Sequence, residues 1–287
     1  MTEVATSRTS ERLLVIIDPV ALRADGESAR IAKDVLSAGA ATKVCVPEGP
    51  EEFARALERR GSRRPVVVGD DRALLRAVSL LHRRRELAGC ALSVVPVGGA
   101  LALARSLGVP TGAVAAARAV LEGAERRLDL LVDDSDGVVL GALRIPPVGA
   151  PREERSAEAG HPWLRTCQSL VRTLVPARHP SRLAAAPGDG PSRLRVEVDG
   201  RTLVDLDQPV QGVSVRPGGP GGRARVEVRP ASVGAEASPL LTEGRTVTVS
   251  GAHFRYRADA AVRGPVGTRT WAVREGAWGL VLPTGRA

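Results

Sequence analysis

Residues 66–81 read VVVGDDRALLRAVSLL, the pattern of one strand–turn–helix unit. Three consecutive valines favour a buried strand, because β-branched side chains pack well on a pleated surface. Gly69 and two aspartates favour a turn, and apolar residues then recur at helical spacing from Ala73 to Leu81. A buried strand followed at once by an amphipathic helix is typical of a parallel sheet with helical crossovers.

The same alternation runs outward in both directions, from Arg12 to about Leu143. The expected strands are 13–17, 43–46, 66–68, 92–95, 128–132 and 138–143, and the expected helices are 29–36, 51–57, 73–81 and 114–121. Pro50 and Thr111 fit helix starts, since proline has no amide to lose there and a threonine oxygen accepts from one. The sequence therefore predicts an α/β domain with a mainly parallel sheet over residues 12–145, preceded by a disordered N-terminus at 1–11.

After Ser192 the apolar residues alternate with polar ones, which is the period of a half-buried strand. Asp199 and Gly200 fit a hairpin turn, because glycine tolerates the positive φ that a type I′ turn demands. Further strands are expected at 201–206, 213–215, 225–228, 246–249, 254–257, 270–273 and 280–282. This pattern predicts an all-β sandwich domain over residues 193–287, with the option that its last strand returns to the first domain.

Residues 146–192 are rich in Pro, Ala, Gly and Arg and are predicted to form a linker. The linker contains one segment of helical periodicity, in which Leu164, Cys167, Leu170, Val171 and Leu174 form an apolar stripe. Core packing is the primary interpretation of this stripe, and binding to a membrane interface is the alternative.

Charge and composition narrow the expected partners. The formal net charge of +9 favours a polyanion, either nucleic acid or the anionic face of a membrane. The chain has only three tryptophans, two phenylalanines and one tyrosine, too few for the stacking platforms of single-strand or RNA binders. We therefore expect no nucleic acid. Arg83–Arg85 and Arg126–Arg127 are candidate membrane contacts, with solvated element ends as the plainer explanation; the oligomeric state is left open.

No metal site and no membrane span are expected. Cys45, Cys90 and Cys167 lie far apart and are read as buried free thiols, and the four histidines lack a paired ligand spacing. No apolar run reaches the roughly 18 residues of a membrane span, and the first residues carry no apolar signal core. A cytoplasmic protein is expected, with peripheral association at the membrane as an alternative.

Three segments, taken together, resemble the catalytic domain of diacylglycerol kinases and related lipid kinases. Residues 14–20, LVIIDPV, resemble the family's opening strand and its Asn-Pro turn. Residues 66–74 resemble the strand, the G-G-D-G-T loop that holds ATP phosphates, and the start of the next helix. Residues 92–110, LSVVPVGGALALARSLGVP, resemble the motif P-L-G-T-G-N-D-F-A-R-x-L-G-I-P. The resemblance implies an N-terminal domain like that of NAD kinase and diacylglycerol kinase.

The resemblance also implies a site, although many of its motif residues are replaced. The implied nucleotide-binding positions are Asp18, Gly69, Asp71, Arg72, Gly98 and Gly99. The family's D-G-E element, which supplies its general base, aligns with Asp259, Ala260 and Ala261, so that Asp259 is the catalytic candidate. Four of these residues have a plainer explanation: tight turns for Gly69 and Gly98, a cap of the helix near Ala73 for Asp71, and a solvent-facing turn for Asp259.

Three functions follow as hypotheses. The family reaction is ATP-dependent phosphorylation of a lipid hydroxyl, with ATP and Mg²⁺ as cofactors, and the replaced motifs favour a pseudokinase with neither. The first alternative is a divergent but active lipid kinase. The second is a non-catalytic module that binds a lipid, a membrane or a protein partner. The sequence does not identify the lipid.

Overall fold

The computed structural model describes residues 12–147, 191–219, 221–231 and 238–284. The predicted disordered N-terminus, the apolar stripe from Leu164 to Leu174 and Cys167 lie outside the described residues. Cys45 and Cys90 are free thiols, as predicted, although only Cys90 is fully buried. None of the helices in the described part combines the length and apolar character needed to cross a bilayer.

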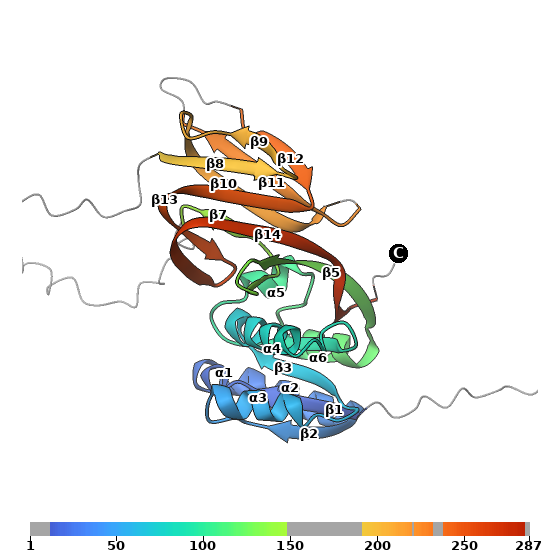
Figure 1. Ribbon diagram of the computed structural model, residues 1–287. Helices are drawn as coiled ribbons and strands as arrows, with labels where there is room; N and C mark the ends of the chain where they lie inside the picture. The colour runs from blue at the N-terminus through green and yellow to red at the C-terminus, as the bar shows by residue number, and fades with distance from the viewer. Residues whose placement is uncertain (1–11, 148–190, 220, 232–237, 285–287) are drawn as a thin grey trace, which may run out of the picture.

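The first half of the chain is a parallel sheet covered by helices on both faces (Figure 1). Four strands pair in parallel in the order β2-β1-β3-β4. The elements in chain order are β1 (Arg12–Ile17), α1 (Pro19–Ala24), α2 (Gly26–Gly39), β2 (Ala41–Cys45), α3 (Pro50–Glu58), β3 (Arg64–Gly69), α4 (Asp71–Arg83), β4 (Ala91–Pro96), α5 (Ala102–Ser106), α6 (Ala113–Glu122), β5 (Ala124–Asp133), β6 (Val138–Val139) and β7 (Leu143–Ile145).

Strand β1 explains why the sheet is buried on both faces. Successive side chains of a strand point to opposite sides, so an unbroken apolar run supplies two cores. Leu14 and Ile16 join the core beneath α3 and α4. Leu13, Val15 and Ile17 join the core beneath α2 and α6.

Several local predictions for this half need correction. Helices α1 and α5 were not predicted, because six and five residues are too short to display helical periodicity. The expected strand 138–143 is divided into β6 and the start of β7. Helix α3 begins at Pro50 as predicted, but α6 begins after Gly112 without a side-chain cap, so Thr111 does not cap it.

The C-terminal half is built of strands, as predicted. They are β8 (Ser192–Val198), β9 (Arg201–Val204), β10 (Pro209–Gly219), β11 (Arg223–Pro230), β12 (Leu240–Gly244), β13 (Thr246–Ala258) and β14 (Ala261–Leu282). Asp199 and Gly200 both have positive φ, at 50° and 75°, and form the predicted turn between β8 and β9. Strands β7, β10, β8 and β13 pair in a closed ring around a valine-rich core. The predicted sandwich is therefore a ring of strands that β7, from before the linker, completes.

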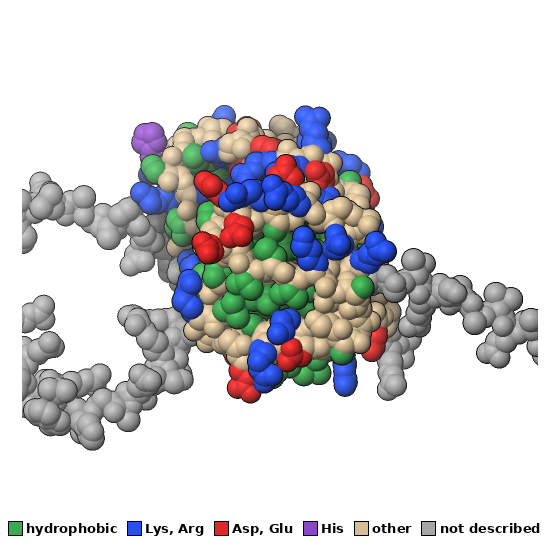
Figure 2. Space-filling model, turned by 90° about the horizontal axis from the view of Figure 1, so that it is seen from below, with side chains coloured by type: hydrophobic (Ala, Val, Ile, Leu, Met, Phe, Trp, Pro, Cys, Tyr) green, Lys and Arg blue, Asp and Glu red, His purple; other side chains and the backbone are tan. Residues whose placement is uncertain are grey.

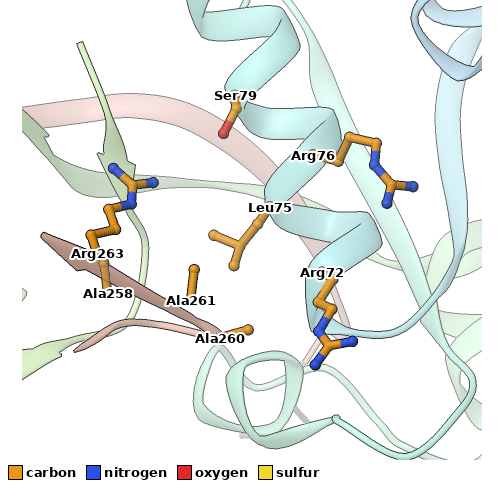
Figure 3. A pocket seen from close by; sticks show the side chains of 8 residues that line it. All are labelled: Arg72, Leu75, Arg76, Ser79, Ala258, Ala260, Ala261 and Arg263. Atoms are coloured by element: carbon orange, nitrogen blue, oxygen red, sulfur yellow. The ribbon is translucent and has the colours of Figure 1, made fainter. Parts of the chain in front are cut away.

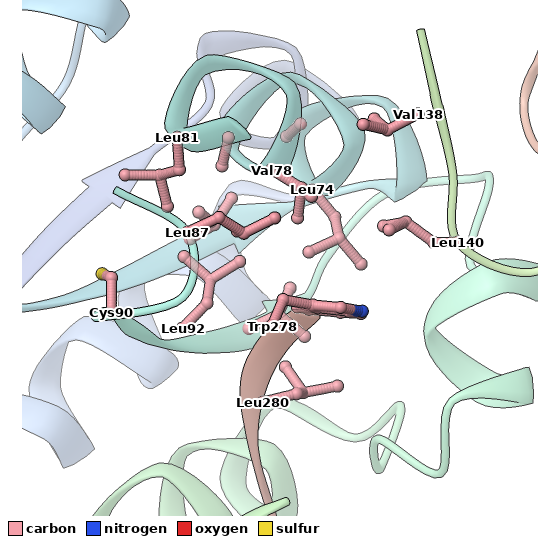
Figure 4. Packing of buried hydrophobic residues seen from close by; sticks show 14 of the residues in the cluster. Leu74, Val78, Leu81, Leu87, Cys90, Leu92, Val138, Leu140, Trp278 and Leu280 are labelled. Atoms are coloured by element: carbon pink, nitrogen blue, oxygen red, sulfur yellow. The ribbon is translucent and has the colours of Figure 1, made fainter. Parts of the chain in front are cut away.

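Strand β14 joins the two halves, and in Figure 1 it runs from the C-terminal strands down to the helical layer. It pairs with β13 and β5 in antiparallel fashion, and its Gly279 and Leu280 pair in parallel with β4. It carries two fully buried tryptophans, Trp271 in the C-terminal core and Trp278 in the core beneath α4. Figure 4 shows Trp278 among Leu74, Leu92 and Leu280. One strand therefore contributes a large anchor to each core.

The opposite end of the sheet is an edge. Strand β2 pairs only with β1 among the described strands, and Val44 and Val46 are exposed there. Figure 2 views the molecule from this end and shows an apolar area edged by basic side chains. The exposed Lys43 lies on the same strand, and a charged side chain hinders pairing at such an edge.

We expect Trp278→Ala to lower the free energy of unfolding by about 3–5 kcal/mol, because a buried indole leaves a cavity that the core cannot refill. Chemical denaturation followed by circular dichroism measures this change. Leu241→Ala is the matched control, because its side chain is 74% exposed and its removal should change stability by less than about 0.5 kcal/mol. Equal effects of the two changes would contradict the anchoring role of Trp278.

Candidate functional site

The loops after β1, β3 and β4 meet at the carboxyl edge of the parallel sheet, where α/β proteins bind their ligands. Backbone hydrogen bonds join neighbouring loops: the Asp18 amide donates to the Val68 carbonyl at 2.9 Å, and the Val97 amide donates to the Gly69 carbonyl at 3.0 Å. The Asp71 amide donates to the Ala100 carbonyl at 2.8 Å. The structure thus brings the six residues of the implied nucleotide site to one edge: Asp18, Gly69, Asp71, Arg72, Gly98 and Gly99.

Asp71 is buried, and its carboxylate accepts hydrogen bonds from the first turn of α5 rather than from its own helix. Its Oδ2 accepts from the Leu103 amide at 2.8 Å and its Oδ1 from the Ala104 amide at 3.0 Å, 32 and 33 positions later in the chain. Burial raises the pKa of Asp71, and the amides of Leu103 and Ala104 act against this shift. The prediction that Asp71 caps the helix near Ala73 is wrong, because its oxygens lie on the first turn of α5.

Asp70 caps α4 instead. Its Oδ1 accepts from the Arg72 amide at 3.0 Å and from the Ala73 amide at 3.1 Å. Unpaired amides at a helix N-terminus are the groups that bind phosphates in many proteins. Here a carboxylate of the chain takes that position, and its negative charge would repel a phosphate.

Asp18 holds α1 and α4 together. Its Oδ1 accepts from the Val20 amide at 2.7 Å and caps α1, while its Oδ2 accepts from the Arg76 guanidinium at 2.8 Å. Arg76 also lies over the Phe53 ring, 5.4 Å from its centroid. Asp18 is thus a buried structural carboxylate with partners on both oxygens.

The glycines differ in what the backbone requires of them. A Cβ on Gly69 would lie 2.7 Å from Ala73 Cβ and 3.1 Å from Asp18 Cβ, so the close packing of the loop excludes a side chain. Gly98 has a φ of +114°, which only glycine adopts readily. At Gly99 a Cβ would meet nothing within 4 Å. The fold itself therefore accounts for Gly69 and Gly98, and nothing in the local structure accounts for Gly99.

Asp259 is a turn residue, with a φ of +49°, but its carboxylate points onto the backbone. It accepts from the amides of Leu140, Gly141 and Ala142 at 2.7, 2.8 and 2.9 Å. Burial raises the pKa of Asp259, and these amides act against the shift. The prediction of a solvent-facing residue is therefore wrong: Asp259 fastens the β13–β14 turn to the chain between β6 and β7.

A pocket of about 230 Å³ lies between α4 and the β13–β14 turn (Figure 3). We call it the α4 pocket, and its lining residues are Arg72, Leu75, Arg76, Ser79, Ala258, Ala260, Ala261 and Arg263. Among the described residues that line it there is no carboxylate and no imidazole. In Figure 3 the Leu75 and Ser79 side chains reach from α4 toward the hairpin, and the Arg76 side chain points away from it. The pocket therefore has arginine side chains at its rim and mostly apolar side chains between them.

Sequence reasoning did not select Arg76, Ser79 or Arg263. Arg76 and Ser79 carry a local signal, because four and seven positions after Arg72 place them on the same helix face. Arg263 carries none, since only the pairing of β13 with β14 brings it to the pocket. Its guanidinium lies 3.2 Å from the buried Asp133 carboxylate.

Asp133 forms an ion pair with Arg263. Burial opposes its ionisation, but hydrogen bonds from Ser135 and Gly137, with the charge of Arg269, outweigh burial and lower the pKa of Asp133. The carboxylate is therefore ionised at neutral pH and holds Arg263 by charge.

The arginine runs named as membrane contacts lie at the ends of elements. Arg83 is the last residue of α4, and Arg84, its C-cap residue, pairs with Glu58 at 3.0 Å. Arg127 on β5 donates to the carbonyls of Ala88 and Gly276, both at 3.0 Å. Some of these guanidinium groups are therefore engaged within the protein.

We expect Asp71→Asn to lower the free energy of unfolding by about 1–3 kcal/mol, because an amide has one acceptor oxygen and would leave a buried N–H unpaired. Asp70→Asn is the matched control on the adjacent residue. Asparagine caps helices as well as aspartate does, so its cost should stay below about 0.5 kcal/mol. Denaturant titration of both variants checks the difference, and equal stabilities would contradict the role assigned to Asp71.

Comparison with known proteins relates the first half of the chain to a family model. The model of the diacylglycerol kinase catalytic domain matches residues 12–132, from β1 to the end of β5, which include all three loops. A solved structure named as a diacylglycerol kinase from Bacillus anthracis str. Sterne aligns with a TM-score of 0.67 and 13% identity, covering 96% of this chain and 98% of that chain.

Two further solved structures from the same organism and carrying the same enzyme name align with 15% and 14% identity and a TM-score of 0.67. They too cover 96% of this chain and 98% of theirs. At such identities the likeness concerns the fold, and it extends over both halves of the molecule. No curated protein matches the chain. Residues 12–132 of this chain therefore match the catalytic domain of the diacylglycerol kinases, and the chain shares the fold of these solved structures over nearly its whole length.

Proposed function

We propose that this chain is a pseudokinase, a member of the diacylglycerol kinase family that keeps the fold and does not transfer phosphate. The lining of the α4 pocket carries the proposal. Ala261, which aligns with the family's presumed base, lies in that lining, and its described residues supply only arginine, leucine, serine and alanine side chains. A base must be a titratable group within hydrogen-bond reach of the acceptor hydroxyl, and alanine cannot remove a proton.

The phosphate-binding loop supports the same conclusion. Phosphoryl transfer consists mostly of positioning and charge neutralisation around the transferred group. The Arg72 and Ala73 amides, which a phosphate would need at the start of α4, already donate to Asp70. An incoming phosphate would have to displace a carboxylate of the same charge sign.

The residues present do not fit Mg²⁺, the metal that an active member would use with ATP. Mg²⁺ prefers oxygen ligands in a near-octahedral arrangement. The carboxylate oxygens of Asp71 and Asp259 accept from buried or half-buried backbone amides. Within the described ranges no three His, Cys, Asp or Glu side chains are gathered in a way that could hold a metal. We therefore assign no chemical step to ATP or Mg²⁺ in this chain.

The divergent active kinase is the competing proposal, and Arg72 favours it. A cation at a loop position that is usually glycine could neutralise phosphate charge in place of the lost amides. It would still need a group to orient the lipid hydroxyl, and the α4 pocket offers only Ser79 and three arginines for that.

We expect the full-length protein to form no labelled phosphatidic acid above a heat-killed control when incubated with Mg²⁺, γ-labelled ATP and diacylglycerol. The same result is expected with a total lipid extract as acceptor, because the defect lies in the phosphate loop and the base. An active family member run in parallel shows that the assay works. Label transferred by the wild type and diminished by Asp71→Asn would overturn the pseudokinase and establish the active alternative.

A further inference from the structure

We propose that the outer face of the C-terminal strands binds an acidic peptide segment of a partner protein, with Arg144 of β7 and Arg216 of β10 as its principal contacts. The site is a pocket of about 290 Å³ over β7, β10 and β11, which we call the β10 pocket. Its described lining residues are all different from those of the α4 pocket, so this inference goes beyond the proposed function.

The β10 pocket is a depression in the outer face of the sheet. Gly212 and Ser214 of β10 are its small lining residues. Ser214 is paired with Arg144 on β7 and with Glu227 on β11. Directly opposite side chains lie about 4.5–5.5 Å apart, so two long charged side chains flank one short hydroxyl. The pocket is therefore open to solvent between charged walls.

The charge of these walls favours an anion. Three lining side chains are arginines and one is a glutamate. The glutamate, Glu227, is held by Arg229, whose Nε lies 2.7 Å from Oε1. In the described parts of the chain, Arg144 and Arg216 have neither an ion pair nor a side-chain hydrogen bond, and both are exposed. The pocket therefore retains two positive charges that an acidic ligand could neutralise.

The cross-strand neighbours of these arginines are also basic. Arg144 is paired with Arg257 on β13, and Arg216 is paired with Arg225 on β11. Glu243 offsets the charge of Arg225 at 3.4 Å. Like charges directly opposite each other destabilise a sheet. Carboxylates bound over this face would reduce the remaining repulsion.

The spacing of Arg144 and Arg216 favours an extended peptide. The two residues are diagonal neighbours, because Ser214, which is paired with Arg144, lies two positions before Arg216. Diagonal neighbours are about 7–8 Å apart. In an extended chain, side chains on the same face are about 6.6–6.8 Å apart, at about 3.3–3.4 Å per residue. Two glutamates separated by one residue would therefore meet one arginine each, and an arginine fork pairs well with one carboxylate.

The rest of the lining disfavours other polyanions. The described lining residues include no aromatic side chain on which a nucleic acid base could stack. The apolar lining residues Ile145, Pro146 and Val213 are buried or half-buried, so they offer no projecting side chain to enter a bilayer. An acidic peptide needs neither feature.

The test is fluorescence anisotropy of the full-length protein with short fluorescein-labelled Ser/Thr peptides. One peptide carries two glutamates separated by one residue. The control peptide carries two adjacent glutamates, which point to opposite sides of an extended chain. We expect the first peptide to bind about tenfold more tightly, because only it presents both carboxylates to the pocket.

Variants of the protein locate the binding. Arg144→Ala and Arg216→Ala should each weaken binding of the first peptide about tenfold and make the two peptides bind alike. Arg201→Ala removes the same charge from an exposed position on β9 outside the pocket lining, and should change binding less than about twofold. Both pocket arginines are exposed, so circular dichroism should show the wild-type Tm for each variant.

The absence of peptide binding would overturn the proposal. Equal binding of the two peptides, or an equal effect of Arg201→Ala, would also overturn it, because attraction would then depend only on net charge. Flotation with phosphatidylglycerol vesicles tests the competing partner: vesicle binding that Arg144→Ala and Arg216→Ala abolish, without a peptide preference, would assign the face to a membrane instead. Kinase activity would overturn the pseudokinase and leave these expectations unchanged, because the two pockets share no described lining residue.

Discussion

A buried carboxylate must find hydrogen-bond donors, and around this site the donors are the protein's own backbone amides. Asp71 accepts from the first turn of α5, and Asp259 accepts from the segment between β6 and β7. Asp18 caps α1 and holds Arg76 of α4. These bonds fix the loops at the edge of the sheet relative to one another, and through the β13–β14 turn they connect the two halves. The shape of the α4 pocket depends on them.

The same bonds limit the chemistry. The oxygens of Asp71 and Asp259 already accept from backbone amides, and the amides that donate to Asp70 are engaged in the same way. On the proposed pseudokinase function, the loops keep their packing while the groups that would act on a nucleotide serve the structure. The side chains that line the α4 pocket are basic and apolar.

The sequence predicted the elements whose cause is local. Runs of β-branched residues gave the parallel strands, and Asp199–Gly200 gave the hairpin, because turn chemistry acts over two residues. The sequence did not predict that β13 is one unbroken strand from Thr246 to Ala258, or that β14 is one unbroken strand from Ala261 to Leu282. The expected breaks after Val249 and Val273 coincide with register shifts between Ser250 and Phe254 and between Arg274 and Trp278. A bulge and a strand end look alike in sequence, because both interrupt the alternation.

The resemblance assigned Asp71 and Asp259 to the site, and the structure places Asp71 at the start of α4 and Asp259 in the β13–β14 turn. Their hydrogen-bond partners lie 32 to 119 positions away and leave no local pattern. Arg263 reaches the pocket only because a hairpin folds back onto α4, so no spacing could reveal it. Asp70, by contrast, precedes a helix directly and carries the usual N-cap signal, which the neighbouring Asp71 obscured.

We propose that the protein itself occupies the phosphate loop, and calorimetric titration of the full-length chain with magnesium ATP measures whether the loop is open to nucleotide. An active member of the family, titrated under the same conditions, provides the positive control. We expect no saturable heat from this chain. Saturable binding in the micromolar range that is lost in Asp71→Asn, with the variant still folded, would contradict it, because it would mean that the loop opens to nucleotide.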